Sequence, residues 1–376
     1  MDTNETYERY QRQLILKGFG ERGQQKLLAA KVLVIGAGGL GCPALQYLVA
    51  AGVGNIGIVD DDTVALSNLH RQVLYTTQDI GFPKVTKSKE RLQQLNPSVN
   101  ITGYNERLTP QNALAIIEAY DIIIDGTDNF ASRYMINDAC VLLNKPLVYG
   151  AVSKFEGQVA IFNNASKKGT KPVNYRDLFP VPPKNGEVLN CAEAGVLGVL
   201  PGIIGTMQAS ETIKLITGIG EPLVNSLLTY NALGNQVYTI SLHARANPAG
   251  LPATAEDFQN TNYEWLCGGT TIEHEIDAAT FNGLLEKDTV SIIDVREFGE
   301  SPLISDFNYL KIPLSQLKEN IPAVENDTVV VFCQSGKRSL QAAQVLTEAF
   351  ANEKKIYSLK GGILTWLRSR QTTSSI

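Results

Sequence analysis

The strongest constraint on the fold is a short apolar run that ends in a cluster of glycines. Residues 31–35 read Lys-Val-Leu-Val-Ile, and residues 36–41 read Gly-Ala-Gly-Gly-Leu-Gly. The β-branched run predicts a buried strand, the glycines predict a tight turn, and the apolar-periodic residues 43–51 predict a helix. A second strand over 56–59 ends at Asp60, at the spacing from the glycines where a dinucleotide-type fold places an acid on the ribose hydroxyls. The sequence therefore predicts a Rossmann-like unit.

The same alternation of strands and helices continues toward the middle of the chain. Apolar runs predict strands at 122–124 and 146–149, and helical periodicity predicts helices at 84–96, 111–119 and 132–143. After Phe155 the pattern changes to antiparallel strands, expected at 157–162, 227–231 and 236–241. One long apolar helix is expected between the first two of them, at 195–218. Together they predict an α/β fold with a doubly wound, mostly parallel sheet and an antiparallel extension.

A second, smaller α/β unit is expected toward the C-terminus. Strands are predicted at 291–295, 328–332 and 356–359. Between the last two strands, a loop is predicted at 333–338 and a helix at 339–350. Before it, the polar stretch 244–269, rich in Ala, Pro, Asn, Thr and Gly, has no sustained period. The predicted boundaries are a first domain over 1–245, a linker over 246–270 and a second domain over 271–376.

The balance of charges argues against two classes of partner. The chain has 33 Lys and Arg, 38 Asp and Glu, a formal net charge of −5 and no basic run, so neither nucleic acid nor an anionic membrane is expected to bind. The longest apolar stretch, 194–207, is too short to cross a bilayer, and the N-terminal residues lack the apolar core of a signal peptide. Five cysteines without a close pair indicate free thiols. We therefore expect a cytoplasmic protein.

The glycine turn alone does not identify a ligand. Without Cβ atoms its backbone can approach a phosphate, but NAD(P), FAD and ATP are all compatible with it, as is a purely structural turn. Polar and charged residues later in the chain narrow the choice; they are Asp60, Asp62, Ser67, Asn68, Arg71, Lys84, Asp128 and Asn129. An enzyme that cleaves ATP between its α- and β-phosphates needs cations for the phosphoryl oxygens and a carboxylate for Mg²⁺, whereas a hydride-transfer enzyme does not.

With Arg-Tyr-Gln-Arg-Gln at 9–13, these motifs resemble the MoeB/ThiF family, the bacterial relatives of ubiquitin-activating enzymes, over residues 5–245. The resemblance implies a homodimer that binds ATP and Mg²⁺ and adenylates the C-terminal glycine of a ubiquitin-like sulfur-carrier protein ending in Gly-Gly. It implies nucleotide binding by Gly36, Gly38, Gly39, Gly41, Asp60, Asp62, Ser67, Asn68, Arg71, Lys84, Asp128 and Asn129.

Individual roles follow from the same resemblance. Asp60 would contact the ribose. The triphosphate would be held by Asn68, Arg71 and Lys84. Asp128 would bind the metal. Arg12 would reach into the partner subunit's site.

The three histidines are scattered and form no metal-binding pattern, so the cysteines are the candidate metal ligands and nucleophiles. Many members of the family hold a structural zinc with two Cys-x-x-Cys pairs, but here residues 174–177 read Asn-Tyr-Arg-Asp, and the second region offers only Cys267. We therefore expect no zinc site. Cys191, before the long apolar helix, resembles a cysteine that some members link covalently to the carrier; the alternative is a small buried residue. Cys42 and Cys140 are expected to be packing residues.

Cys333 is the stronger candidate nucleophile. It follows the strand 328–332 and opens the loop Cys-Gln-Ser-Gly-Lys-Arg, which runs straight into a helix. Such a loop can direct backbone N–H groups, a helix dipole and two cations at the sulfur, which favours a thiolate or a persulfide.

The C-terminal region as a whole resembles a rhodanese (sulfurtransferase) domain over 271–376. Besides the cysteine loop, the resemblance depends on Asp-Val-Arg-Glu at 294–297 and Gly-Gly at 361–362. The segment 306–313 departs from the family pattern, which leaves activity on simple donors such as thiosulfate open.

Together, the two resemblances predict an adenylyltransferase with a sulfurtransferase domain. A Cys333 persulfide, loaded by a donor such as a cysteine desulfurase, would deliver sulfur directly or through Cys191 to give a thiocarboxylate on the carrier. The MoaD/ThiS-like carrier would serve molybdopterin, thiamine or cysteine synthesis or tRNA thiolation, and we favour the small subunit of molybdopterin synthase. The alternatives are a ThiF-like adenylyltransferase of thiamine biosynthesis, a non-catalytic ATP-regulated scaffold for a ubiquitin-like protein, and an NAD-dependent oxidoreductase.

Overall fold

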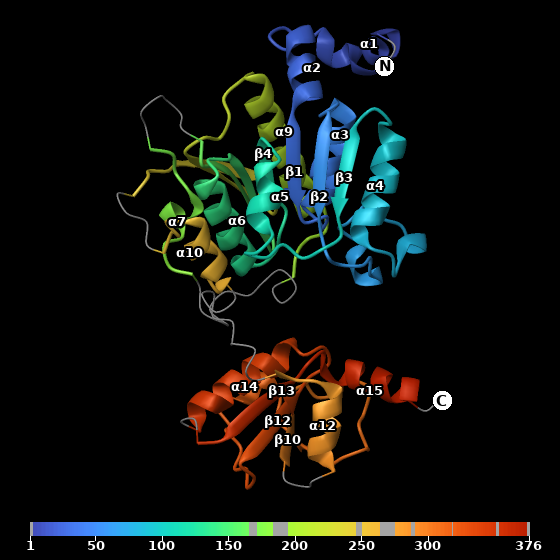
Figure 1. The fold of residues 1–376 in the computed structure, drawn as a ribbon, viewed down its shortest axis with the longest axis vertical. Helices are drawn as coiled ribbons and strands as arrows, with labels where there is room; N and C mark the ends of the chain where they lie inside the picture. Colours follow the sequence, from blue (N-terminus) through green and yellow to red (C-terminus); the bar gives the residue numbers. More distant parts are fainter. Residues whose placement is uncertain are drawn as a thin grey trace. The chain divides into compact units, whose positions relative to one another are not determined.

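The computed structural model describes residues 3–164, 171–182, 195–245, 250–263, 275–286, 290–317, 319–350 and 353–373. The chain forms two compact units that divide between Cys267 and Gly268. The ribbon in Figure 1 shows that each unit consists of a sheet covered by helices.

The first unit is built on an eight-stranded sheet in the order β3-β2-β1-β4-β5-β6-β7-β8. The strands from β3 to β5 in this order are parallel, and β6, β7 and β8 are added antiparallel. The bounds are β1 Lys31–Ile35, β2 Asn55–Val59, β3 Asn100–Tyr104, β4 Ile122–Asp125, β5 Leu147–Ser153, β6 Glu156–Phe162, β7 Ser226–Asn231 and β8 Gln236–Ser241. This confirms the predicted doubly wound α/β sheet with its antiparallel extension.

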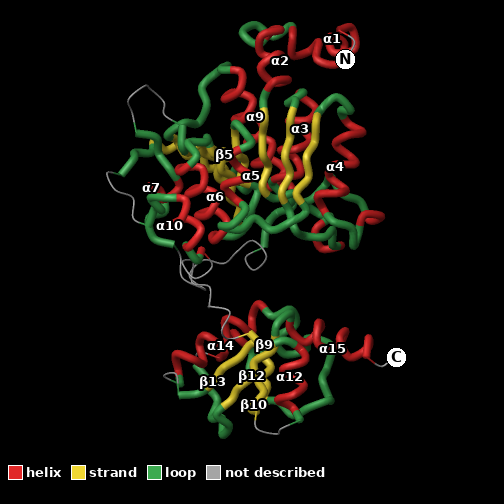
Figure 2. The backbone as a smooth tube through the Cα atoms, viewed as in Figure 1, coloured by secondary structure: helices red, strands yellow, loops and turns green. Residues whose placement is uncertain are grey.

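Helices cover both faces of this sheet, as the red and yellow segments of Figure 2 show. Because both faces are covered, residues 32–35 of β1 are all buried, with Val32 and Val34 in one apolar cluster and Leu33 and Ile35 in another. The first cluster includes residues of α3 (Gly41–Ala51), α4 (Lys84–Leu95) and α9 (Val199–Thr217), and the second includes residues of α5 (Ala113–Glu118), α6 (Phe130–Leu142) and α7 (Tyr175–Leu178). Among the described residues, no helix is both long and apolar enough to cross a membrane.

Two N-terminal helices, α1 (Thr3–Leu14) and α2 (Gly20–Ala29), were not among the predicted elements. They lie at the end of the sheet where β1 begins, opposite to its glycine turn (Figure 1). The hydroxyl of Tyr10 accepts a hydrogen bond from Nδ2 of Asn96 at 2.8 Å. A Cβ placed on Gly52, the C-cap of α3, would lie 2.5 Å from the Tyr10 ring. Thus α1 is packed against the C-terminal end of α3.

The prediction of a linker over 246–270 is wrong for its middle part. Residues 250–263 contain α10 (Ala255–Asn260), which packs against α6, and both Phe258 and Tyr263 are buried. The side chain of Thr254 caps the helix by accepting a hydrogen bond from the N–H of Asp257 at 3.1 Å. The polar composition conceals this helix because a single phenylalanine supplies most of its buried apolar surface.

A buried network of hydrogen bonds connects residues 250–263 to α6 and α7. The guanidinium of Arg176 donates to both carboxylate oxygens of Asp138, from Nε at 2.8 Å and from Nη2 at 2.6 Å, and both side chains are buried. The hydroxyl of Tyr263 donates to the same carboxylate at 2.9 Å. Arg176 belongs to the Asn-Tyr-Arg-Asp segment at 174–177, which takes the place of a zinc-binding cysteine pair of the resembled family. Charged and hydroxyl groups therefore join these elements at that position.

The second unit is a five-stranded, fully parallel sheet in the order β11-β10-β12-β13-β9. Its strands are β9 Glu275–Ile276, β10 Val290–Asp294, β11 Leu310–Lys311, β12 Thr328–Phe332 and β13 Lys355–Leu359, and its helices are α12 Ala278–Leu285, α13 Leu314–Leu317, α14 Lys337–Ala349 and α15 Gly362–Thr373. Edge-to-face contacts of Phe307 with Phe281, Phe332 and Trp366, at 5.3–5.8 Å between ring centroids, fill one side of this sheet. The strands and helix predicted for this unit are confirmed as β10, β12, β13 and α14.

Candidate active sites

The glycine turn joins β1 to α3, and its own packing requires two of its glycines. A Cβ on Gly41 would lie 1.8 Å from the carbonyl oxygen of Gly36, and Gly36 itself has a φ of +94°. Gly38 is different, because the nearest atom to a Cβ there is Nε2 of Gln72, at an ordinary contact distance of 3.6 Å. The N–H groups of Gly38 and Gly39 have no hydrogen-bond partner among the described residues. The turn thus presents free donors at an open position, as a phosphate site requires.

Asp60 lies at the end of β2, directly beside this turn. Its carboxylate accepts hydrogen bonds from the N–H of Ala37 at 2.7 Å and from the N–H of Asp62 at 2.8 Å. Burial raises the pKa of Asp60, and the nearby Lys84 opposes this effect. Each carboxylate oxygen can accept a further hydrogen bond, so the group is placed to receive hydroxyl donors next to the turn.

Lys84 begins α4 and forms an ion pair with Asp62. The distance from Nζ to Oδ2 is 2.8 Å, and the side chains are 5% and 71% exposed respectively. Lys84 is close enough to both Asp60 and Cys42 to lower their pKa values by its charge. The structure therefore brings this buried cation to the turn, with Asp62 as its counterion.

Arg71 is a second cation that lies next to the turn. Its Cγ lies 3.6 Å from the position of a Cβ on Gly39, and its Nη1 donates to the carbonyl oxygen of Ser67 at 3.0 Å. The side chain of Asn68 accepts from the N–H of Ala65 at 3.2 Å. Within the described residues, Ser67 and Asn68 therefore shape the segment that carries Arg71, and their direct contact with a nucleotide stays a prediction.

Gln72 is a site residue that the sequence reasoning missed. It is buried next to the open position of the turn, and its Oε1 has no hydrogen-bond partner among the described residues. An unsatisfied buried acceptor is uncommon and points to a donor that is supplied by a ligand or water. The signal in the sequence was its position directly after Arg71.

The segment 125–129 approaches the turn from the end of β4. The carboxylate of Asp125 accepts from the N–H and the hydroxyl of Thr127, at 2.9 and 2.6 Å. Asp128 is exposed, and no hydrogen bond or ion pair is formed by its carboxylate within the described chain. It fits a metal ligand because hard cations prefer free carboxylate oxygens. Asn129 instead caps α6 by accepting from the N–H of Ser132 at 2.9 Å, and its role toward a nucleotide stays a prediction.

Arg12 is not brought to the turn of its own chain. It lies exposed in the last turn of α1, which packs at the C-terminal end of α3, whereas the glycine turn is at the N-terminal end. The 11 residues of α3 correspond to a separation of about 16 Å along the helix axis. A role for Arg12 in a partner subunit's site stays a prediction.

Two of the cysteines singled out in the sequence, Cys191 and Cys267, lie outside the described residues. In the part of the chain that the structure describes, no group of His, Cys, Asp and Glu side chains is arranged to hold a metal ion. The expected absence of zinc therefore stays a prediction.

Cys333 follows β12 and lies under the loop that leads into α14. Its Sγ accepts the N–H of Gly336 at 3.2 Å and lies 3.5 Å from the hydroxyl oxygen of Ser339. Gly336 has a φ of +92°, and a Cβ on Gly362 would lie 2.6 Å from the carbonyl group of Gln334. The loop therefore curls around the sulfur as predicted, and glycine is required where the Gly-Gly pair touches it.

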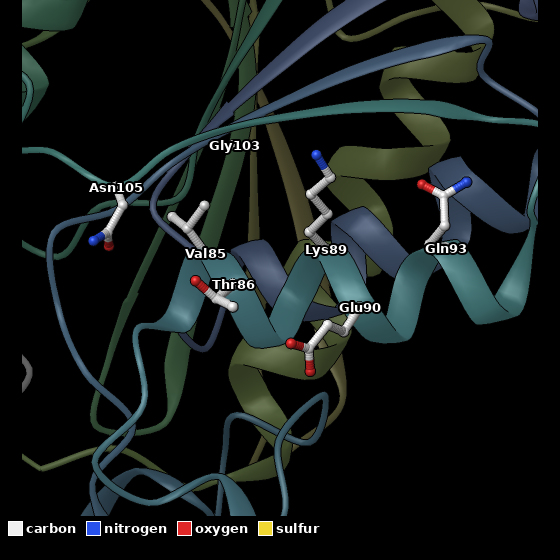
Figure 3. Close-up of a pocket in the computed structure, with 7 residues that line it drawn as sticks. All are labelled: Val85, Thr86, Lys89, Glu90, Gln93, Gly103 and Asn105. Atoms are coloured by element: carbon white, nitrogen blue, oxygen red, sulfur yellow. The ribbon is translucent and has the colours of Figure 1, made fainter.

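A shallow groove of about 420 Å³ lies between α4 and the edge strand β3 (Figure 3). It is lined by Val85, Thr86, Lys89, Glu90, Gln93, Gly103 and Asn105. In Figure 3, Lys89 and Gln93 extend on the strand side of the helix, while Glu90 points to the opposite side. None of the predicted site residues lines this groove, so it is separate from the glycine turn.

The fold and these two sites define a nucleotide-binding α/β enzyme joined to a small sulfurtransferase-like unit. Family models agree with this class: the ThiF family model matches residues 10–251, and the rhodanese-like domain model matches residues 277–369. The chain belongs to the ThiF family and carries a rhodanese-like domain. It is an adenylyltransferase/sulfurtransferase, and the adenylyltransferase activity implies the use of ATP.

Individual relatives share this organisation. A sulfur carrier protein adenylyltransferase of Thermus thermophilus is 51% identical over 268 residues, covering 71% of this chain and 98% of that protein. The probable adenylyltransferase/sulfurtransferase MoeZ of Mycobacterium tuberculosis is 39% identical over 381 residues, covering 98% of this chain and 95% of that protein. Among solved structures, E. coli MccB with a bound MccA derivative has a TM-score of 0.56 at 20% identity and covers 72% of this chain and 76% of its own, which shows a shared fold.

Proposed function

We propose that the first unit adenylates the C-terminal glycine of a ubiquitin-like sulfur-carrier protein and that the second unit supplies the sulfur for a thiocarboxylate. The relative named sulfur carrier protein adenylyltransferase supports the class of substrate. The observation that carries the proposal is the glycine turn, where the N–H groups of Gly38 and Gly39 have no partner among the described residues and both Arg71 and Lys84 lie nearby.

In this proposal each residue around the turn binds a different part of the nucleotide. The N–H groups of Gly38 and Gly39 would bind phosphate oxygens, and Asp60 would accept the ribose hydroxyls. Asp128 would hold Mg²⁺, which supplies charge neutralisation on the phosphates. Arg71 and Lys84 would neutralise the charge that develops on the departing pyrophosphate.

The adenylation step needs no covalent intermediate on the protein. A carboxylate oxygen of the carrier attacks the α-phosphorus of ATP, a new O–P bond forms, and the bond to pyrophosphate breaks. Because the carrier's carboxylate is already ionised near neutral pH, no general base is required. Catalysis then consists of positioning the two reactants and stabilising charge.

The sulfur step uses Cys333. The outer sulfur of a Cys333 persulfide attacks the carbonyl carbon of the acyl-adenylate, and AMP leaves. A second thiol, for which Cys191 is the candidate, then attacks the sulfur of Cys333 in the resulting acyl disulfide. This releases the thiocarboxylate and leaves a Cys191–Cys333 disulfide, which an external thiol must reduce before the next turnover. The proposed donor of the persulfide sulfur is a cysteine desulfurase.

We also propose the finer assignments that the sequence favours. The carrier is the small subunit of molybdopterin synthase, with a ThiF-like role in thiamine biosynthesis as the alternative. The enzyme acts as a homodimer in the cytoplasm, uses Mg²⁺ with ATP and needs no zinc.

The experiment is carrier-dependent exchange of labelled pyrophosphate into ATP. Arg71→Ala and Asp128→Ala are expected to lower exchange at least about a hundredfold, because each removes a charge that acts on the phosphates. Asp61→Asn is the matched control, since Asp61 is exposed and adjacent to the site, and it should stay within about twofold.

Full exchange activity in either Ala variant would remove these assignments. Binding of ATP without AMP transfer to any Gly-Gly-ending carrier would instead support a scaffold. Nicotinamide-dependent absorbance changes would support an oxidoreductase. Mass spectrometry of each candidate carrier, after incubation with ATP and a sulfur source, identifies the partner by exchange of one oxygen for sulfur.

A further inference from the structure

One of the two cations of the Cys333 loop, Arg338, is already paired. Both terminal nitrogens of Arg338 donate to the carboxylate of Glu300, from Nη1 at 2.5 Å and from Nη2 at 2.7 Å. Glu300 comes from the segment after β10 and is 38 residues away in sequence. The guanidinium of Arg338 is near enough for the Cys333 sulfur to raise the pKa of Arg338 by its charge, so the ion pair lies beside the sulfur site.

Glu300 is held in place for this contact. Its Oε1 also accepts the N–H of Glu297 at 2.8 Å, and Arg338 keeps the pKa of Glu300 at about 2. The Glu297 side chain is a second nearby carboxylate whose charge reaches Arg338, and it accepts a hydrogen bond from the hydroxyl of Ser315 at 3.1 Å. Among the described side chains, the charge of Arg338 is therefore balanced by two acids.

This arrangement distinguishes between sulfur donors by their charge. Thiosulfate is a compact dianion, and a site that admits it must offer unpaired cationic charge. A thiol persulfide carries its reactive sulfur on a carbon chain with no sulfonate. The carboxylates of a donor such as glutathione persulfide lie many bonds from that sulfur, so such a donor gains less from a cation beside Cys333. Pairing of Arg338 with Glu300 therefore weakens the electrostatic attraction of the site for thiosulfate and changes its attraction for a thiol persulfide very little.

We propose that Glu300 is a specificity-determining residue of the sulfur-transfer site: by pairing with Arg338 it favours a thiol persulfide over thiosulfate as the donor. The inference rests on the proposed function, in which Cys333 accepts sulfur. The Cys333 thiolate attacks the outer sulfur of the donor persulfide and forms the Cys333 persulfide. The S–S bond of the donor breaks, the donor leaves as a thiolate, and the proton stays on the transferred sulfur.

The experiment compares two donors on the full-length chain, with thiosulfate and with glutathione persulfide as probes. Sulfur loading of Cys333 is followed by mass spectrometry, and steady-state transfer to cyanide gives kcat/KM. Glu300→Gln keeps the shape of the side chain but frees the charge of Arg338. It is expected to raise kcat/KM for thiosulfate about tenfold, mainly through a lower KM, and to change persulfide loading less than about twofold.

Two further variants isolate the cause. Glu297→Gln removes an equal charge from the same segment without breaking the ion pair, so it should raise kcat/KM for thiosulfate by less than Glu300→Gln does. Adding Arg338→Gln to Glu300→Gln should abolish the gain, because no cation is then released. Circular dichroism confirms that each variant is folded.

The possible results separate the two proposals. An unchanged thiosulfate activity in Glu300→Gln overturns the role of Glu300, as does an equal gain in Glu297→Gln or a gain that persists without Arg338. If Cys333 of the unmodified chain takes no sulfur from glutathione persulfide, the proposed sulfur-transfer function fails, and this inference fails with it.

Discussion

Gly38 and Gly41 lie three residues apart in one turn, but alanine should act differently at each. Gly41→Ala would place a Cβ 1.8 Å from a backbone oxygen, so we expect a loss of about 3 kcal/mol or more in the free energy of unfolding. Gly38→Ala meets only an ordinary contact, so its stability should stay within about 0.5 kcal/mol while its ATP affinity falls at least about tenfold. Urea unfolding and calorimetry measure the two effects. Normal ATP binding by Gly38→Ala would place the phosphates elsewhere.

Glu300 predicts a pH dependence of stability for the second unit. The pKa of Glu300 is lowered from 4.5 to about 2 by its bonds to Arg338. A lowered carboxyl pKa stabilises the fold above the unfolded value and loses this contribution as pH falls through the folded value. Between pH 4.5 and 2 the unmodified chain should therefore lose more stability than Glu300→Gln does. Thermal unfolding scans across this range test the difference, and parallel curves would contradict it.

Individual site residues differed in how well the sequence predicted them. Asp60, Arg71 and Lys84 lie next to the turn, where ordered motifs and strand ends placed them, and their roles toward a nucleotide stay predictions. Gln72 and Asp125 were missed as site residues. Their importance comes from burial and unpaired oxygen atoms, which depend on packing between segments far apart in the chain.

At the scale of elements, the buried network of Asp138, Arg176 and Tyr263 should carry a large share of the docking of α10. Asp138→Ala leaves the Arg176 guanidinium buried without its main partner, which is expected to cost about 3–5 kcal/mol. Tyr263→Phe removes one hydrogen bond and should cost about 1 kcal/mol. Urea unfolding gives the energies, and limited proteolysis should cut residues 250–263 faster in both variants. Unchanged cleavage would show that other contacts hold this stretch.

The elements that the sequence predicted and those that it missed differ in burial. The strands β1 and β4 are continuous apolar runs, and the apolar residues of α6 recur at helical spacing. Their sequence patterns therefore predict the type of element clearly. β3 has one buried residue out of five, and α10 has a single large apolar side chain that is buried. Such elements are stabilised by packing against neighbouring elements, and their own residues give no sign of that packing.

At the scale of the whole molecule, a chelator should separate stability from activity. If no zinc is bound, EDTA should leave the thermal unfolding temperature unchanged, because the Arg176–Asp138 pair contains no metal. It should abolish carrier-dependent pyrophosphate exchange, and added Mg²⁺ alone should restore it. A fall in the unfolding temperature that only Zn²⁺ reverses would contradict this prediction.

Cys42, Cys140 and Cys333 are all buried, so their surroundings rather than their exposure bear on which of them can accept sulfur. Burial raises the pKa of Cys42 to about 12 and the pKa of Cys140 well above its usual value. Because thiolates carry out sulfur exchange, neither side chain competes for an incoming sulfane atom. Cys333 is the remaining thiol in the described part of the chain. If Cys333 accepts sulfur as proposed, selective delivery would depend on the low reactivity of Cys42 and Cys140 as well as on the loop that surrounds Cys333.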